Sequence, residues 1–70
     1  MASKKENIKK VFEALKILAK KQNNLVSVED IIVYCKTLKI EADVVEYSIE
    51  TLLAQGDIYQ PKKNVLSVLK

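Results

Sequence analysis

The sequence contains no histidine, and Cys35 is its only cysteine. A lone cysteine has no disulfide partner, and without histidine the usual zinc-ligand spacings and histidine-dependent acid–base catalysis are excluded. Gly56 is the only glycine, so the glycine-rich loop with Lys and Ser or Thr that cradles a nucleotide phosphate is absent from the sequence. We therefore expect a domain that is not an enzyme on its own and that holds no metal or cofactor.

Arginine is also absent, because all 12 basic residues are lysines. The guanidinium fork that reads guanine edges is therefore missing, and we expect any DNA contact to be with phosphate. The net charge of +3 is unevenly spread. Residues 1–24 carry seven lysines against two glutamates, whereas residues 25–60 carry two lysines against seven acidic residues. The N-terminal third is thus the part of the chain best suited to a polyanion.

No apolar run approaches the ~18 residues of a membrane-spanning helix, and the N-terminus lacks the apolar segment of a signal peptide. We expect a cytoplasmic protein without membrane association. A chain of 70 residues, 49% of them apolar, has room for one compact domain. We expect residues 1–4 to be a flexible tail or a cloning remnant, and residues 5–70 to form a single domain that is monomeric in isolation.

Apolar residues recur at helical spacing in three segments. The first helix is expected over residues 5–21, with Ile17 facing outward. The second helix is expected to begin at Val28, with Ser27 as N-cap and with the Asp30 side chain binding back to the backbone amide of Ser27. The third is expected to run from Asp43, as its N-cap, to Gly56. The inward positions predicted for the three helices are Ile8, Val11, Phe12, Leu15, Leu18 and Ala19, then Val28, Ile31, Ile32, Cys35 and Leu38, then Val45, Ile49, Leu52 and Leu53.

Two short β-prone runs, "DIYQ" and "VLSVL", follow Gly56 and are joined by "PKKN". This arrangement predicts a hairpin with a loop of about four residues. Leu25 and Val26 predict a further, very short strand. The order helix, short strand, helix, helix, hairpin is that of a winged helix-turn-helix, a mainly α fold with a small β-hairpin. In that fold the third helix occupies the DNA-recognition position and "PKKN" is the tip of the C-terminal wing.

The junction "LLAQG" followed by "DIYQPKKNVLSVL" resembles the C-terminal winged-helix domain of archaeal minichromosome maintenance (MCM) replicative helicases. In that family the start of the wing reads Gly, acid, Ile-Tyr, any residue, Pro, basic. The resemblance covers the element order of the chain and, at motif level, residues 56–64. A glycine usually follows the proline in that family, whereas Lys62, Lys63 and Asn64 follow it here.

This resemblance implies a small module tethered behind an AAA+ ATPase motor in the same parent chain. The expected partners are that motor domain and other replication proteins, and the expected location is the nucleoid. The implied role is to modulate the ATPase and unwinding activity of the parent helicase ring.

Charges on the third helix argue against the usual DNA contact of a winged helix, in which that helix enters the major groove. Its charged residues are Asp43, Glu46 and Glu50, and no lysine lies between Lys39 and Lys62. Asp43 and Glu46 also suit the first turn of a helix, where acids favour the dipole. Carboxylates repel phosphate even where they also stabilise the helix. We therefore expect weak or no nucleic-acid binding.

The helical period places Tyr47, Glu50 and Thr51 on the face of the third helix opposite the core. Together with Tyr59 on the hairpin, they are the expected protein-interaction surface, since exposed aromatic side chains commonly anchor partners. Partial packing of both tyrosines against the domain itself is an equally open interpretation.

An alternative function is a DNA-binding winged helix that contacts the phosphate backbone without reading sequence. The lysines available for weak phosphate contacts are Lys9, Lys16, Lys20, Lys62 and Lys63. Lys9, Lys16 and Lys20 of the first helix also fit a solvent-exposed face that carries i,i+4 ion pairs, such as Lys9 with Glu13. A purely solvated role for these three lysines is therefore also open.

Overall fold

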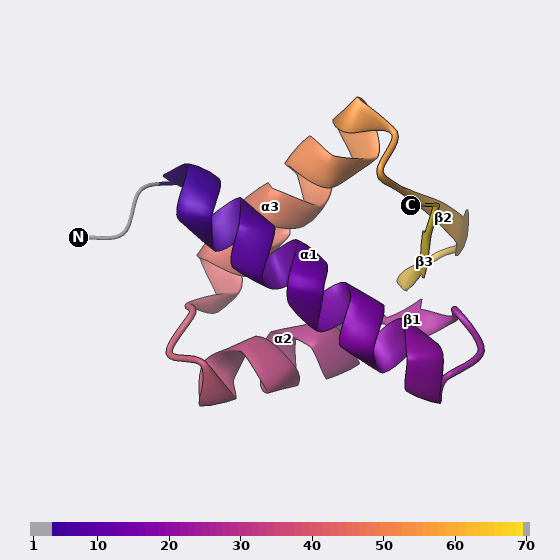
Figure 1. Ribbon diagram of the computed structural model, residues 1–70, viewed down its shortest axis with the longest axis horizontal. Helices are drawn as coiled ribbons and strands as arrows, with labels where there is room; N and C mark the ends of the chain where they lie inside the picture. Colours follow the sequence, from indigo (N-terminus) through magenta and orange to yellow (C-terminus); the bar gives the residue numbers. More distant parts are fainter. Residues whose placement is uncertain (1–3, 70) are drawn as a thin grey trace.

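The structure, a computed structural model, describes residues 4–69, with side chains from Glu6 onward. Three helices are followed by a small antiparallel sheet that ends in a hairpin, which confirms the predicted winged helix-turn-helix arrangement (Figure 1). The elements are α1 (Lys4–Lys21), β1 (Val26–Ser27), α2 (Val28–Thr37), α3 (Ala42–Gln55), β2 (Ile58–Lys62) and β3 (Val65–Val68). Helix α1 begins one residue earlier than expected, and residues 1–3 of the expected tail lie outside the described residues.

Helix α1 runs between α2 and α3, and its C-terminal end points toward the sheet (Figure 1). The inner side chains of the helices meet those of the sheet in one apolar core. Its buried apolar members are Val11, Ala14, Leu15, Leu18, Ala19, Val26, Ile31, Cys35, Ile40, Val45, Ile49, Leu52, Ile58 and Leu66. The helical periodicity predicted most of this set, because a continuous apolar stripe can be buried only on one side of a helix.

Leu38 and Ser48 are two of the positions that depart from the predicted pattern. Leu38 was expected to point inward but is 46% exposed. It follows the last residue of α2 as the C-cap, so the helical period no longer sets the direction of its side chain. Ser48 is fully buried in the middle of α3, and its hydroxyl is satisfied because Oγ donates to the carbonyl of Val44 at 2.8 Å.

Helix α2 begins as expected at Val28, with Ser27 as its N-cap. Ser27 has extended backbone angles, and its Oγ accepts a hydrogen bond from the amide of Glu29 at 3.2 Å. The expected reciprocation by Asp30 is replaced by another contact, in which the Asp30 carboxylate accepts from Gln22 Nε2 at 3.2 Å. Asp30 therefore ties the end of α1 to the start of α2.

The predicted N-cap of α3 is wrong, because the helix starts earlier in the chain. Glu41 is the N-cap, without a side-chain capping bond, and Asp43 lies in the first turn. The cause lies just before the helix, where Lys39 takes a left-handed φ of 63° and Ile40 enters the core with 5% exposure. Burying Ile40 brings the chain back toward the core, so the helix begins two residues after it.

The wing is tighter than the predicted four-residue loop. Only Lys63 and Asn64 form the turn, and Pro61 and Lys62 belong to β2. Asn64 has φ 63°, a left-handed conformation that asparagine tolerates. The pairs Tyr59–Ser67 and Lys62–Val65 differ in register by one residue, so β2 bulges around Pro61. Proline has no N–H to donate, and a bulge in an edge strand is a position that tolerates it.

Asn24 joins the loop after α1 to the C-terminal strand. In the order β1-β3-β2, β3 is the central strand. The Asn24 side chain makes two hydrogen bonds with the backbone of Val68, in β3. The Val68 amide donates to Oδ1 at 2.7 Å, and Nδ2 donates to the Val68 carbonyl at 3.0 Å. The hydroxyl of Ser67 donates to the Asn24 carbonyl. Because β1 has only two residues, the Asn24 carboxamide extends the pairing of β3 beyond it.

We expect Asn24→Ala to lower the free energy of unfolding by about 2–3 kcal/mol, because it leaves a partly buried amide and carbonyl without partners. Asn23→Ala is the matched control. Asn23 has a similar left-handed φ of 55° against 62° for Asn24, so both substitutions lose the same backbone preference. Urea unfolding would measure both variants. Equal losses of stability would mean that the carboxamide contacts of Asn24 contribute nothing.

Gly56 ends α3 in the predicted left-handed conformation, with φ 77° and ψ 15°. Its amide and that of Asp57 donate to the carbonyls of Leu53 and Leu52 at 3.2 and 3.1 Å, which satisfies the last turn of the helix. A Cβ built on Gly56 would meet no atom within 4 Å. Glycine is therefore favoured by its backbone conformation and not by lack of space.

We expect Gly56→Ala to lower the free energy of unfolding by about 1 kcal/mol, the cost of placing alanine in a left-handed conformation. Gly56→Asn should lose less, because asparagine adopts this conformation more readily. Thermal unfolding of the two variants beside the natural protein measures the difference. Alanine as stable as asparagine would show that the left-handed angle costs nothing here.

Candidate interaction site

The outer face of α3 exposes two of the three residues predicted for it. Tyr47 is 47% exposed and Glu50 is exposed, whereas Thr51 is half-buried. The hydroxyl of Thr51 donates to the carbonyl of Tyr47 at 3.0 Å, one helical turn earlier. This bond occupies the Thr51 hydrogen, so Tyr47 and Glu50 supply most of what a partner on this face would meet.

The accessible charge of α3 is entirely negative. Asp43, Glu46 and Glu50 are all exposed, and the sequence of Ala42–Gln55 contains no lysine. The Asp43 carboxylate accepts the amide of Val44 at 2.9 Å, so part of its hydrogen-bonding capacity is used within the helix. Duplex DNA carries one phosphate charge per ~1.7 Å of axis, and a major groove approached by this helix would bring like charges together.

Tyr59 lies on β2, opposite Ser67 of β3, and is 43% exposed. Its side chain therefore remains partly available on the wing. The neighbouring residues of β2 are exposed as well, from Gln60 to Lys62. The aromatic parts of the predicted surface thus come from two separate elements, one on α3 and one on the wing.

Lysines of α1 are partly engaged with their own helix. The Nζ of Lys16 lies 4.5 Å from the centre of the Phe12 ring and 3.9 Å from a carboxylate oxygen of Glu13. The expected pairing of Glu13 with Lys9 is therefore replaced by an i,i+3 pair with Lys16. An exposed pair of this kind contributes under about 1 kcal/mol, so Lys16 can exchange Glu13 for another anion at little cost.

Two lysines of α1 share one hollow. Lys16 and Lys20 line it together with Asn24 and Val68, next to the hydrogen bonds that hold β3. Lys9 lies nearer the other end of the helix, in a hollow that it shares with Phe12 and residues of α3. The structure thus brings together two of the three predicted phosphate-contacting lysines of α1 and places the third elsewhere.

The lysines of the wing, Lys62 and Lys63, are both exposed at the end of the hairpin. This turn lies against the start of α2, where the amide of Val28 donates to the carbonyl of Asn64 at 2.9 Å. Glu29 and Asp30 follow directly in the first turn of α2, and both are exposed. The wing turn therefore adjoins the acidic first turn of α2.

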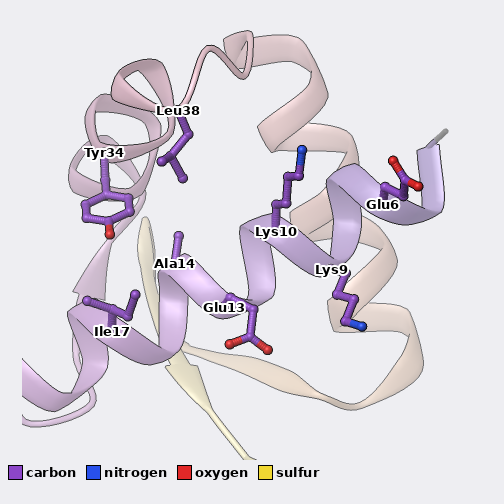
Figure 2. A pocket seen from close by; sticks show the side chains of 8 residues that line it. All are labelled: Glu6, Lys9, Lys10, Glu13, Ala14, Ile17, Tyr34 and Leu38. Atoms are coloured by element: carbon purple, nitrogen blue, oxygen red, sulfur yellow. The ribbon is translucent and has the colours of Figure 1, made fainter. Parts of the chain in front are cut away.

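A groove between α1 and α2, about 520 Å³ in volume, was not predicted from the sequence. Figure 2 shows Tyr34 of α2 and Leu38, which follows α2, pointing toward Ala14 and Ile17 on α1. Lys10 points to the same side of α1 as these residues, whereas Lys9 and Glu13 point away from it. The lining residues are Glu6, Lys9, Lys10, Glu13, Ala14, Ile17, Tyr34 and Leu38. Ile17 was the available signal, because it is an apolar residue outside the predicted stripe of α1.

Cys35 is completely buried in the core, as predicted from its place on the inner face of α2. Burial raises the pKa of its thiol, since the thiolate would lose hydration. The protonated thiol acts as a small apolar side chain. Within residues 4–69 no group of three or more acids or cysteines is placed to hold a metal ion.

Comparisons of the chain with protein-family models, with curated proteins and with solved structures found no match. No helix within the described residues is both long and apolar enough to cross a lipid bilayer. The class of the protein therefore follows from its fold. It is a winged helix-turn-helix in which α3, the helix at the DNA-recognition position, is acidic.

Proposed function

We propose that this domain is the accessory C-terminal winged-helix module of a replicative MCM-type DNA helicase, and that it works through protein contacts. The proposal draws on the residues 56–64, whose order resembles the start of the wing in archaeal members of that family. In this role the domain modulates the ATPase and unwinding activity of its parent ring. It performs no chemistry of its own, because the ATPase motor belongs to another part of the parent chain.

One observation carries the preference for protein contacts over DNA: the exposed face of α3 is acidic and aromatic. Tyr47 and Glu50 are exposed on α3, the helix that a DNA-binding winged helix lays in the major groove. Repulsion between these carboxylates and phosphate is strongest at low salt, where screening is least. A protein partner with a basic or apolar patch fits the same face, since an exposed tyrosine can anchor it and Glu50 can pair with a lysine or arginine.

A second candidate function is weak, sequence-independent binding of DNA phosphate. It is favoured by the hollow that Lys16 and Lys20 share and by the exposure of Lys62 and Lys63. Because these lysines act only as charges, the binding would fall steeply with salt. Neighbouring carboxylates at Glu13 and Glu29 limit its strength. This candidate differs from the first in one measurable quantity, the affinity of the isolated domain for duplex DNA.

We expect the natural domain to bind a short duplex negligibly at physiological salt, and Glu46→Lys with Glu50→Lys to create binding. The double substitution converts two exposed carboxylates on α3 into phosphate-attracting ammonium groups. Fluorescence anisotropy of a labelled duplex measures the affinity. Glu13→Lys with Glu29→Lys is the control, since it makes the same change in net charge at exposed positions of α1 and α2.

A control variant that binds as tightly as the α3 variant would show that the face of α3 does not limit DNA binding, and that either total charge or the lysines beside Glu13 and Glu29 do. The phosphate-binding candidate would be favoured instead if the natural domain shifts a duplex at submicromolar concentration. Its affinity should then disappear in Lys62→Glu with Lys63→Glu.

The regulatory part of the proposal is tested in the parent helicase. Removing residues 5–70 should change the rate of ATP hydrolysis or unwinding severalfold while leaving most of the DNA affinity in place. Tyr47→Ala with Glu50→Ala, two exposed positions on α3, should reproduce that change without unfolding the domain. Steady-state ATPase and strand-separation assays measure it, with Lys36→Ala on α2 as the control. Unchanged rates together with a large loss of DNA affinity would contradict the proposal.

A further inference from the structure

The groove between α1 and α2 shares no lining residue with the α3 and wing surface of the proposed function. Its apolar side chains remain accessible: Ile17 is 43% exposed, Leu38 is 46% exposed, and Tyr34 is half-buried beside them. Ala14 forms part of the wall and is small enough for another helix to approach closely. A hydrophobic groove between two helices is a shape that accepts an amphipathic helix.

One positive charge adjoins this apolar section. Lys10 points to the same side of α1 as the apolar lining residues, whereas its neighbours Lys9 and Glu13 point away (Figure 2). Lys10 is exposed, and it makes no ion pair with a carboxylate among the side chains that the structure describes, from Glu6 onward. Its aliphatic stem can lie along apolar surface while the ammonium group stays at the rim. The groove therefore combines an apolar floor with a cation that no carboxylate contacts within this part of the chain.

We propose that this groove binds an amphipathic helix of a partner protein, with the apolar side of that helix over the apolar floor and one of its carboxylates paired with Lys10. The spacing along α1 defines what such a helix carries. Lys10 and Ile17 are seven residues apart, which is ~10 Å along a helix axis, and Ala14 lies between them. A helix aligned with α1 therefore needs large apolar side chains at positions i, i+3 and i+4 and an acid at i+7.

The sign of the charge at Lys10 selects the kind of partner. A basic helix would set like charges against it, and duplex DNA would bring phosphates to Lys10 but little apolar surface to the floor of the groove. A second copy of this chain also fits poorly. Its acidic helix, α3, exposes Tyr47 among three carboxylates and so lacks the continuous apolar stripe that the groove would bury.

Two synthetic peptides that differ in one charge test the proposal. Both are alanine-based helices of about 15 residues with leucine at i, i+3 and i+4, and they carry either glutamate or lysine at i+7. Titration into the isotope-labelled chain, followed by NMR, measures the affinity and maps the site. We expect the glutamate peptide to bind with a Kd of about 0.1–1 mM and to shift the signals of Ala14, Ile17, Tyr34 and Leu38. The lysine peptide should bind about three- to tenfold more weakly, since it replaces an exposed attraction by a repulsion.

Reversing the charge of Lys10 separates this ion pair from the overall charge of the domain. Lys10→Glu should invert the preference, so that the lysine peptide binds more tightly than the glutamate peptide. Lys9→Glu is the matched control, because it makes the same change in net charge at the neighbouring residue, which points away from the groove (Figure 2). This control should keep the preference for glutamate. Leu38→Ser should weaken binding of both peptides at least about fivefold, because it removes part of the apolar floor.

Circular dichroism and thermal unfolding establish that each variant is folded, and Ile17→Ser replaces Leu38→Ser if the latter is not. A glutamate peptide that shifts no groove signal at about 1 mM would overturn the proposal. So would a preference that Lys10→Glu leaves unchanged or that Lys9→Glu inverts equally. Groove signals that shift with the concentration of the chain alone would assign the groove to a second copy and overturn it as well. None of these results bears on α3, so the proposed function stands or falls separately.

Discussion

The carboxamide of Asn24 is the contact on which the arrangement of helices and sheet depends. Residues 24 and 68 are far apart in sequence, and their pairing closes the chain so that β3 lies against the end of α1. A three-stranded sheet with a two-residue first strand has few ladder bonds of its own. Side-chain bonds from Asn24 complete it, and they also satisfy backbone groups that would be costly to leave unpaired. The wing then carries its turn to the start of α2, where Asn64 accepts the amide of Val28.

With the wing held in this way, the difference between a DNA-binding and a protein-binding winged helix reduces to the side chains presented by α3. The backbone arrangement is compatible with both, because a fold does not by itself determine function. Here the helix in the recognition position carries exposed carboxylates, whereas the lysines lie on α1 and at the wing, partly paired with acids or next to them. The charges are therefore distributed in the reverse of the pattern that groove binding requires.

The sequence predicted features that local chemistry determines. Gly56 marked the end of α3 because few other residues adopt a left-handed φ, and Ser27 marked the start of α2 because its hydroxyl accepts a backbone amide. Features that depend on distant parts of the chain were missed or misplaced. The start of α3 follows from the burial of Ile40, the length of the wing turn from the register of β2 on β3, and the groove from the crossing of α1 and α2. A short stretch of sequence does not reveal any of these contacts, because each joins segments that are distant in the chain. Among the predicted site residues, the helical period correctly gave the exposure of Tyr47 and Glu50 on α3. It did not show that Lys9 lies apart from Lys16 and Lys20.

The bulge at Pro61 has a consequence for how copies of the chain can meet. A flat outer strand offers a row of unpaired amides and carbonyls onto which a neighbouring molecule can add its own strand, and repeated addition leads to fibres. The outer strand here is bent, lacks one amide at Pro61 and ends at Lys62, which is followed by Lys63 in the turn, and these two lysines repel their equivalents in another molecule. The opposite border of the sheet is only two residues long. Growth by strand addition is thus disfavoured at both edges of the sheet, so the wing can stay exposed for other contacts without acting as a template for fibres.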